Sequence, residues 1–296
     1  MKIFDCFMYF DEELVLDLRL NFLDEYIDYF VIVESKYTHK GEKRKLQFDH
    51  KKFEKFKHKI IYLVFDKEPS DIQLINVNDT KDEKLTKYIY NASYRENGQR
   101  NLILEGLKQA RDNDLILISD VDEIPNLENL NLEKINQEKI FFKQDMFYYK
   151  FNLRLPNFTW IGTKGCKMKY LESPQWLRNI KDRKFPFYRL DTLFSKTKYI
   201  NIKFINDGGW HFTNIKSAAE IHYKLRSYLH HIEFEANPLS QDEIQSIIEN
   251  KVAIYDLKTD KRKNKFGNGE KLEKYPLKKL PLYLQNNINN YQLWLD

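Results

Sequence analysis

The sequence predicts an α/β fold with a mostly parallel central sheet flanked by helices and a mixed C-terminal half. Two observations support this prediction. Strand-like and helix-like segments alternate over residues 1–125, which is the pattern of a parallel sheet with right-handed helical crossovers. The aliphatic residues from Leu115 to Ile118 form an uninterrupted apolar run, as in strands that are buried on both faces.

The first half of the chain contains four predicted strands, at residues 3–9, 29–33, 59–65 and 114–119. Acidic residues at 11–13 open a helix after the first strand, because negative charge is favourable at a helix N-terminus, and apolar residues at helical spacing continue it. Residues 66–82 show no clear period and are predicted to form a loop. Residues 94–112 are predicted to form a helix that leads directly into the fourth strand.

Beyond Pro125 the pattern becomes less regular. Strands are predicted at residues 140–151 and 198–205, and a helix at 216–232. Ser240 and Glu243 form the sequence of a capping box, which predicts that another helix begins there. Residues 258–279 carry nine Lys or Arg residues, and we expect a solvated basic loop. The alternatives are a mobile flap that gathers phosphate or an acceptor glycan, or a peripheral membrane contact.

Charge and cysteine content argue against several classes of protein. The net charge of +5 is smaller than that of dedicated nucleic-acid binders, so no nucleic-acid partner is expected, but it suits an enzyme with phosphate-bearing substrates. Cys6 and Cys166 give neither a disulfide framework nor a zinc-ligand spacing, and Cys6 is expected to be a buried hydrophobic residue. The N-terminus lacks a signal peptide and the chain has no transmembrane segment, so a cytoplasmic location is expected.

The acidic residues Asp120, Asp122 and Glu123 follow the predicted strand at 114–119. In open α/β sheets the ligand crevice lies beyond the carboxyl ends of the strands. Three acids there would repel one another unless a cation neutralises them. Hard divalent ions such as Mg²⁺ or Mn²⁺ take oxygen ligands and are often shared with substrate phosphates. The alternative is an acidic turn that caps the next helix or lies in solvent.

Polar residues also follow the predicted strand at 29–33. Glu34 and Ser35 leave the sheet at the same edge as the acidic residues, and the polar segment 37–41 ends in a glycine that permits a tight loop. A site here could hydrogen-bond a nucleobase or a ribose. A turn or a helix cap explains the same residues equally well.

Two further segments carry candidate binding residues. On the helix at 94–112, Glu96 and Arg100 are spaced to form an i,i+4 pair, and so are Arg95 and Gln99; the arginines suit phosphate contacts or ordinary surface ion pairs. In the segment 206–212, two glycines would let backbone approach a ligand closely. His211 could complete a metal site and Trp210 could stack on a sugar or base, although a histidine among aromatics is more often a core residue. Residues 224–233 are expected to form a solvated helix face.

Five short motifs in this order resemble glycosyltransferase family 17, at residues 30–35, 95–100, 118–125, 209–211 and 224–227. The resemblance covers about residues 1–235. It implies a GT-A type, Rossmann-like fold, a UDP-sugar donor, a divalent metal (Mn²⁺ or Mg²⁺) and inversion at the anomeric carbon. Residues 1–125 would bind the nucleotide sugar, and residues 126–296, including the basic segment, would bind a glycan or glycoconjugate acceptor within one continuous domain. N-acetylglucosamine is the expected sugar, and the chain would be a bacterial or viral member.

The resemblance also implies roles for individual residues. Asp122 and His211 would bind the metal, and Asp120 would contact the metal or the donor ribose. The remaining donor-binding residues would be Glu34, Ser35, Arg95, Arg100 and Trp210, the arginines holding phosphates or bracing the acidic loop. Inversion needs a general base. Asp207 is the first candidate, Glu233 and Glu172 are rivals, and Glu123 is either a base or a brace of the loop.

Two other functions fit part of the sequence. A sugar-nucleotide pyrophosphorylase also uses acids and Mg²⁺ on a similar sheet, but it would normally have a glycine-rich loop after the first strand, where this chain has Phe10-Asp-Glu-Glu13. A non-catalytic glycan- or UDP-sugar-binding module would keep the fold without turnover. The presence of Asp120, Asp122 and His211 argues against such a loss.

Overall fold

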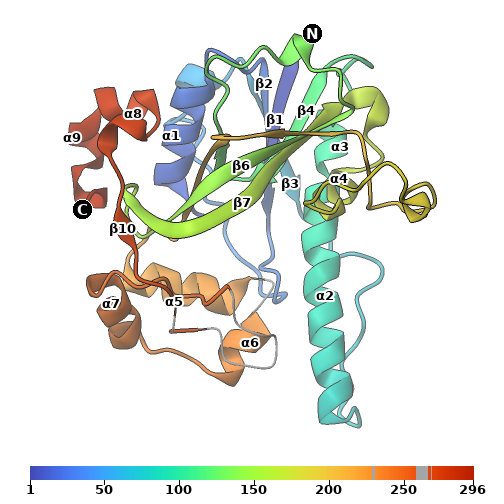
Figure 1. The fold of residues 1–296 in the computed structure, drawn as a ribbon. Coiled ribbons are helices and arrows are strands. Elements are labelled where there is room, and N and C mark those ends of the chain that lie inside the picture. Colours follow the sequence, from blue (N-terminus) through green and yellow to red (C-terminus); the bar gives the residue numbers. More distant parts are fainter. Residues whose placement is uncertain (229–230, 258–265, 268) are drawn as a thin grey trace.

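The computed structural model describes residues 1–228, 231–257, 266–267 and 269–296 (Figure 1). Its strands are β1 Ile3–Tyr9, β2 Tyr29–Ser35, β3 Ile60–Phe65, β4 Leu115–Asp120, β5 Glu123–Pro125, β6 Lys139–Tyr148, β7 Leu153–Lys167, β8 Ile202–Ile205, β9 Gly209–Thr213 and β10 Glu273–Lys274. Its α-helices are α1 Glu13–Leu23, α2 Lys81–Asn101, α3 Ile103–Gly106, α4 Pro174–Asn179, α5 Ala218–Ser227, α6 His231–Ala236, α7 Gln241–Glu249, α8 Leu282–Asn286 and α9 Ile288–Tyr291. Short 3₁₀ helices lie at Glu54–Phe56, Leu132–Lys134, Met168–Tyr170, Leu190–Thr192, Leu277–Lys279 and Gln292–Trp294.

These strands form one sheet in the order β3-β2-β1-β4-β7-β6-β9-β5, with β10 beside β7 and β8 beside β6. The strands β1 to β4 pair in parallel, as the alternation of strands and helices predicts. β7 then pairs antiparallel with both β4 and β6, whereas β8 and β9 run parallel to β6. The predicted α/β class, with a parallel first half, a mixed second half and a Rossmann-like arrangement, is therefore confirmed.

Helices cover both faces of the parallel part of the sheet (Figure 1). Alternate residues of β1 point to opposite faces. Phe7 packs in the core with α1, whereas Phe4 and Cys6 pack in the core with α3 and α4. Cys6 is fully buried, as predicted. A third core, with Met146 among its members, joins α5 and α7 to the end of β6 and the start of β7.

Several elements differ from their predicted bounds. α2 begins at Lys81 rather than at 94, because Thr80 and Glu83 form a capping box there, and it ends at Asn101. β7 was not predicted, because Pro156 and two glycines interrupt its pattern. The helix predicted at 216–232 begins as α5, and residues 229–230 lie outside the described residues. The capping box at Ser240 does open a helix, α7.

Gly209 permits the close pairing of β9 with β5. Its φ is +125°, and a Cβ there would lie 2.1 Å from the carbonyl oxygen of Ile124. Gly209→Ala is therefore expected to lower the free energy of unfolding by at least about 1–3 kcal/mol, measured by urea denaturation. Gly267→Ala is the control, because its φ is also positive (+82°) but the nearest atom would lie 3.6 Å away. An equal loss of unfolding free energy in both variants would show that the close contact with Ile124 does not destabilise Gly209→Ala.

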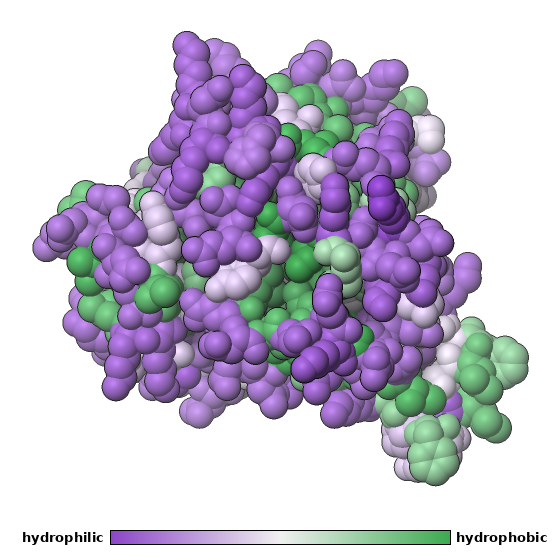
Figure 2. Space-filling model, turned by 90° about the horizontal axis from the view of Figure 1, so that it is seen from above, coloured by the Kyte–Doolittle hydropathy of each residue, from purple (hydrophilic) through white to green (hydrophobic). Residues whose placement is uncertain are grey.

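Hydrophobic residues also gather outside the core. The loop that follows α4 projects to the right in Figure 1, and the projection on the same side of Figure 2 is coloured hydrophobic. None of the helices in the described part of the chain has the length and hydrophobicity needed to span a bilayer. Of the predicted basic segment, residues 258–265 and 268 lie outside the described residues, and the described remainder includes β10 and the short helix Leu277–Lys279.

Candidate active site

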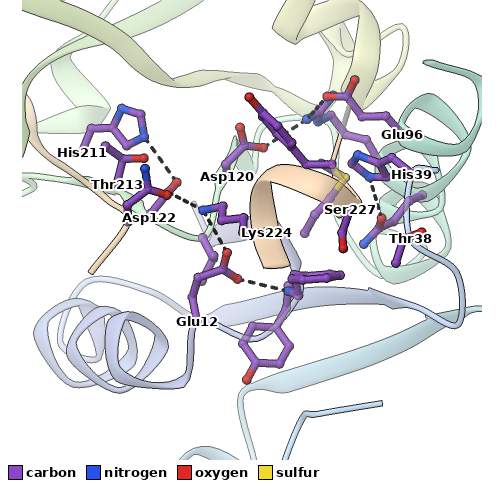
Figure 3. A pocket seen from close by; sticks show the side chains of 18 of the residues that line it. Glu12, Thr38, His39, Glu96, Asp120, Asp122, His211, Thr213, Lys224 and Ser227 are labelled. Atoms are coloured by element: carbon purple, nitrogen blue, oxygen red, sulfur yellow. Dashed lines mark hydrogen bonds and ion pairs between the residues drawn. The ribbon is translucent and has the colours of Figure 1, made fainter. Parts of the chain in front are cut away.

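The candidate active site is a pocket of about 390 Å³ beyond the carboxyl ends of β1 and β4. This is the edge of the sheet where ligands bind in open α/β folds. Its wall combines the turn after β4 with residues from α2, β7, β9 and α5, which lie far apart in the sequence. Figure 3 shows Asp120, Asp122, His211 and Lys224 around one common space. The structure therefore brings together three residues predicted to bind metal.

The backbone of the acidic turn is held by Arg19, a side chain of α1 that is fully buried. Its guanidinium donates hydrogen bonds of 3.0 Å to the carbonyl oxygens of Asp120, Val121 and Glu123. The same group forms a salt bridge of 2.6 Å with Asp5 on β1. Because a buried charge without partners is costly, these contacts fix the turn relative to the sheet.

Two other arginines bind the side chains of the turn. Arg100 and Arg178 each lie 3.1 Å from a different carboxylate oxygen of Asp120. Arg178 also lies 2.7 Å from Glu123, a fully buried acid that accepts a 2.7 Å hydrogen bond from the indole of Trp160. Burial raises the pKa of Asp120, but Arg178 and Arg100 together lower it below its usual value. The chain's own cations thus neutralise these two acids.

Asp122 faces two other basic side chains. Its carboxylate lies 3.5 Å from Nε2 of His211 and 3.7 Å from the ammonium of Lys224, which in turn lies 3.2 Å from Glu12. Burial opposes ionisation of Asp122, but His211 and Lys224 lower its pKa well below the usual range. Burial likewise lowers the pKa of Lys224, but Glu12 and Asp122 raise it above its ordinary value. Asp122 is therefore ionised and Lys224 charged at neutral pH.

Asp122 and His211 fit one divalent cation as a pair of ligands. Two adjacent ligands of an octahedral ion at about 2.1 Å lie about 3 Å apart, close to the 3.5 Å between Oδ1 and Nε2. Among the described residues, no group of three or more His, Cys, Asp or Glu side chains is placed to hold a metal. Ions of this kind usually complete their coordination with water and substrate phosphates. The role of Asp120 as a ligand stays a prediction, since both of its oxygens bind arginines.

The loop after β2 forms another part of the wall. Tyr37, Thr38 and His39 line the pocket, and Gly41, with φ of +105°, donates a hydrogen bond to the carbonyl of Thr38. Arg95 donates hydrogen bonds to the carbonyls of His39 and Lys40 and pairs with Glu68 at 2.8 Å. Arg95 thus braces this loop rather than pairing with Gln99 as its spacing suggests.

Glu34, Ser35 and Trp210 do not line the pocket. The Glu34 carboxylate accepts hydrogen bonds from the backbone of Gln47 and Phe48 and from Tyr62, so it holds the segment that follows the loop. Ser35 accepts a hydrogen bond from the backbone of Tyr37 and shapes the start of the loop. Neighbouring residues in a strand point to opposite faces, so Trp210 points away from the pocket that His211 faces. Trp210 is buried there, and its indole donates a hydrogen bond to the carbonyl of Lys279.

The residues predicted as the general base also lie outside the pocket wall. Asp207 is exposed in the turn between β8 and β9, and Glu233 is exposed on α6. Glu172 is exposed before α4. Glu123 is buried beneath the acidic turn and holds Arg178, which corresponds to the predicted brace. The other carboxylates on the wall are Glu12, paired with Lys224, and Glu96, paired with Arg100 at 2.9 Å as predicted.

Several site residues have no role in the sequence-based prediction, among them Glu12, Arg19, Trp160, Arg178 and Lys224. Trp160 and Arg178 come from segments without a clear pattern, so only the three-dimensional fold reveals their position. Lys224 is expected from the sequence on a solvated helix face. This expectation is wrong, because its ammonium pairs with Glu12 and Asp122 on the pocket wall. The Trp160 ring lies 5.3 Å from the His211 ring and forms an aromatic part of the wall.

Comparisons with known proteins identify relatives of the chain. The chain is similar to the beta-1,4-mannosyl-glycoprotein 4-beta-N-acetylglucosaminyltransferases of mouse (Mus musculus) and human (Homo sapiens), with 25% identity over 228 residues in each case. These alignments cover 72% of this chain and 40% of each relative, so the chain spans less than half the length of the curated relatives it matches. The profile of glycosyltransferase family 17 matches residues 1–296, beyond the stretch of about 1–235 that carries the motifs. The predicted resemblance is confirmed, and the chain belongs to glycosyltransferase family 17.

Proposed function

We propose that the chain is an inverting, metal-dependent glycosyltransferase of the GT-A type that moves a sugar from a UDP-sugar to a hydroxyl of a glycan acceptor. Family membership supports sugar transfer. The names of the mouse and human relatives make N-acetylglucosamine the first sugar to test. The observation that carries the proposal is the Asp122–His211 pair beside Lys224 on the pocket wall.

The charges of the pocket suit a nucleoside diphosphate. When the bond to the sugar breaks, negative charge develops on the leaving phosphate, and cations fixed near it lower the barrier. Lys224 supplies such a cation, since its ammonium is held by Glu12 and Asp122 at the pocket. A divalent ion bound by Asp122 and His211 would act as a Lewis acid on the same phosphate.

The remaining walls suit the other parts of the donor. The side chains and backbone of Tyr37 to His39 offer hydrogen bonds to a base or ribose, and Arg95 keeps this loop in place. The ring of Trp160 offers a flat apolar face of the kind that packs against sugars. Arg19, Arg100 and Arg178 hold the acidic turn before the donor arrives, so little reorganisation accompanies binding.

A thermal-shift panel of UDP-sugars, with and without Mn²⁺, tests the proposal. A ligand that binds only the folded state raises the midpoint temperature of unfolding, and the rise grows with the ligand concentration. We expect a metal-dependent shift with one UDP-sugar, lost in Asp122→Ala. No shift with any nucleotide sugar, in either condition, would overturn the proposal. Proton NMR of the product then tests inversion through the coupling of its anomeric proton.

Lys224→Gln tests the cation separately from the metal ligands. Loss of a charged hydrogen bond to the diphosphate is expected to weaken UDP binding about 10- to 100-fold, measured by titration calorimetry in Mn²⁺. Lys216→Gln is the matched control, because Lys216 pairs with Asp11 at 2.5 Å and does not line the pocket. Unchanged UDP binding in a folded Lys224→Gln protein would show that Lys224 holds only the two acids.

The two other functions have distinct outcomes. Metal-dependent UDP binding without UDP release from any sugar donor would indicate the non-catalytic module. Formation of UTP from a UDP-sugar and pyrophosphate would indicate a pyrophosphorylase, which the family match disfavours.

A further inference from the structure

The loop between α4 and β8 exposes an unusual number of large apolar side chains. Among residues 181–198, Phe187 is 84% exposed and Phe194 is 90% exposed, and the side chains between them follow the same pattern: Tyr188, Leu190 and Leu193 are 68%, 71% and 72% exposed. Single exposed apolar residues are common, but a contiguous group marks a surface that contacts another protein, a ligand or a membrane. Figure 2 shows this group as a hydrophobic projection beside a largely hydrophilic surface.

The base of this loop is firmly fastened to the domain. The backbone of Lys181 donates a 2.8 Å hydrogen bond to the carbonyl of Thr197, which closes the loop. Trp176 on α4 donates from its indole to the carbonyl of Lys196 at 2.8 Å. Phe185 is buried and anchors the loop from inside. The apolar tip is therefore presented on a fixed base, not left over from a missing core contact.

Basic residues surround the apolar tip. The loop contains Lys181, Arg183, Lys184, Arg189, Lys196 and Lys198, against the two acids Asp182 and Asp191. Asp182 is paired by Lys164 from the domain, and Asp191 is paired by Arg189 and Lys198. The other four basic side chains make no ion pair within the described residues. Their charge is available to an anionic partner.

We propose that residues 181–198 dock the protein on an anionic lipid bilayer, with the tip in the headgroup region and the basic residues against lipid phosphates. Aromatic and leucine side chains on one side with Lys and Arg around them are the pattern of interfacial membrane binding. Protein interfaces are instead depleted in lysine and need a broad complementary surface, whereas this tip is a narrow projection.

Docking at this loop would also fix the position of the candidate active site relative to the bilayer. The loop begins directly after α4, and Arg178 of α4 lies 3.1 Å from Asp120 and 2.7 Å from Glu123. The base of the loop is thus joined to the acidic turn by the two ion pairs of Arg178. Membrane docking would hold the pocket at a set position near the bilayer, whichever acceptor the pocket uses. The proposal does not depend on the sugar-transfer chemistry.

Vesicle sedimentation of the full chain tests the proposal. We expect binding to phosphatidylcholine vesicles that contain phosphatidylglycerol and at least tenfold weaker binding to phosphatidylcholine alone. Phe187→Ser combined with Phe194→Ser, at two exposed positions, is expected to weaken binding at least about tenfold without changing the thermal midpoint. Leu74→Ser with Val77→Ser is the matched control, because these residues are 80% and 94% exposed on a different loop. Equal binding of wild type and the phenylalanine variant would overturn the proposal, and so would an equal loss in the control.

A site-specific label gives an independent readout. The native thiols of Cys6 and Cys166 are both buried, so a cysteine introduced by Phe187→Cys can be labelled selectively with an environment-sensitive fluorophore. Anionic vesicles should shift its emission to the blue, whereas the label at Val77→Cys should not respond. If the label shifts with protein concentration in the absence of lipid, and wild type sediments as a dimer that the phenylalanine variant lacks, the tip is a contact between copies and the membrane proposal is wrong.

Discussion

Asp122→Asn is expected to lower sugar transfer at least about 100-fold, because changes even to residues that support a metal ligand cost about 10- to 100-fold. The carboxylate of Asp122 lies on the pocket wall between His211 and Lys224, and its neutral amide would bind a divalent ion poorly. Lys224 keeps Glu12 as a partner, so the fold should survive. UDP release from the donor found in the thermal-shift panel measures the effect.

Asp11→Asn provides the control for this substitution. Asp11 is a neighbouring acid that pairs with Lys216 and does not line the pocket, so its loss should change UDP release by less than about threefold. UDP release that falls by a similar factor in both variants would show that Asp122 has no specific role in the site. UDP release by Asp122→Asn within about threefold of wild type would show the same.

Arg178→Ala is expected to destabilise the protein by about 3–5 kcal/mol, the usual cost of removing one partner of a buried ion pair. Its guanidinium contacts Glu123 through two nitrogens, at 2.7 and 3.0 Å, and Glu123 is fully buried. Without Arg178, that carboxylate would remain buried with the Trp160 indole and the backbone amide of Asp120 as its described hydrogen-bond donors. Urea unfolding measures the loss.

The double variant Arg178→Met with Glu123→Gln separates charge from packing. It removes both charges at similar volume, so it should recover most of the stability lost in Arg178→Ala. If the double variant is as unstable as Arg178→Ala, the loss comes from packing and not from an unpaired buried charge. A loss below about 1 kcal/mol in Arg178→Ala would contradict the bracing role of this residue.

The parallel half of the fold could be predicted because each of its strands is a compact apolar run. Residues 3–9 match β1. The predicted strand at 59–65 begins one residue before β3, and the predicted strand at 114–119 is shifted by one residue from β4. β7 could not be found in this way, because a strand with Pro156 and glycines within it carries the signals of a loop. Its long pairing with β6 and β4 stabilises it instead, and the pairs with β4 join residues 46 to 52 positions apart in the sequence.

The acidic residues of the site could be predicted because they follow a buried strand directly. Their partners could not, since Arg19, Arg178 and Lys224 lie on three helices whose positions depend on the whole fold. The sequence also places Trp210 beside His211 without showing which of the two faces the pocket. Strand alternation allows only one of them there, and the structure shows that it is His211. Trp160, 50 positions before Trp210, supplies the aromatic wall instead.

Electron paramagnetic resonance of Mn²⁺ titrated into the protein, with and without UDP, tests the central claim most directly. The signal of free Mn²⁺ disappears when the ion binds, so no acceptor is needed. We expect UDP-dependent binding of a single ion per chain, at least about tenfold weaker in Asp122→Asn and in His211→Ala. If Mn²⁺ does not bind in the presence of UDP, or binds equally well to wild type and both variants, Asp122 and His211 do not form a metal site for the donor.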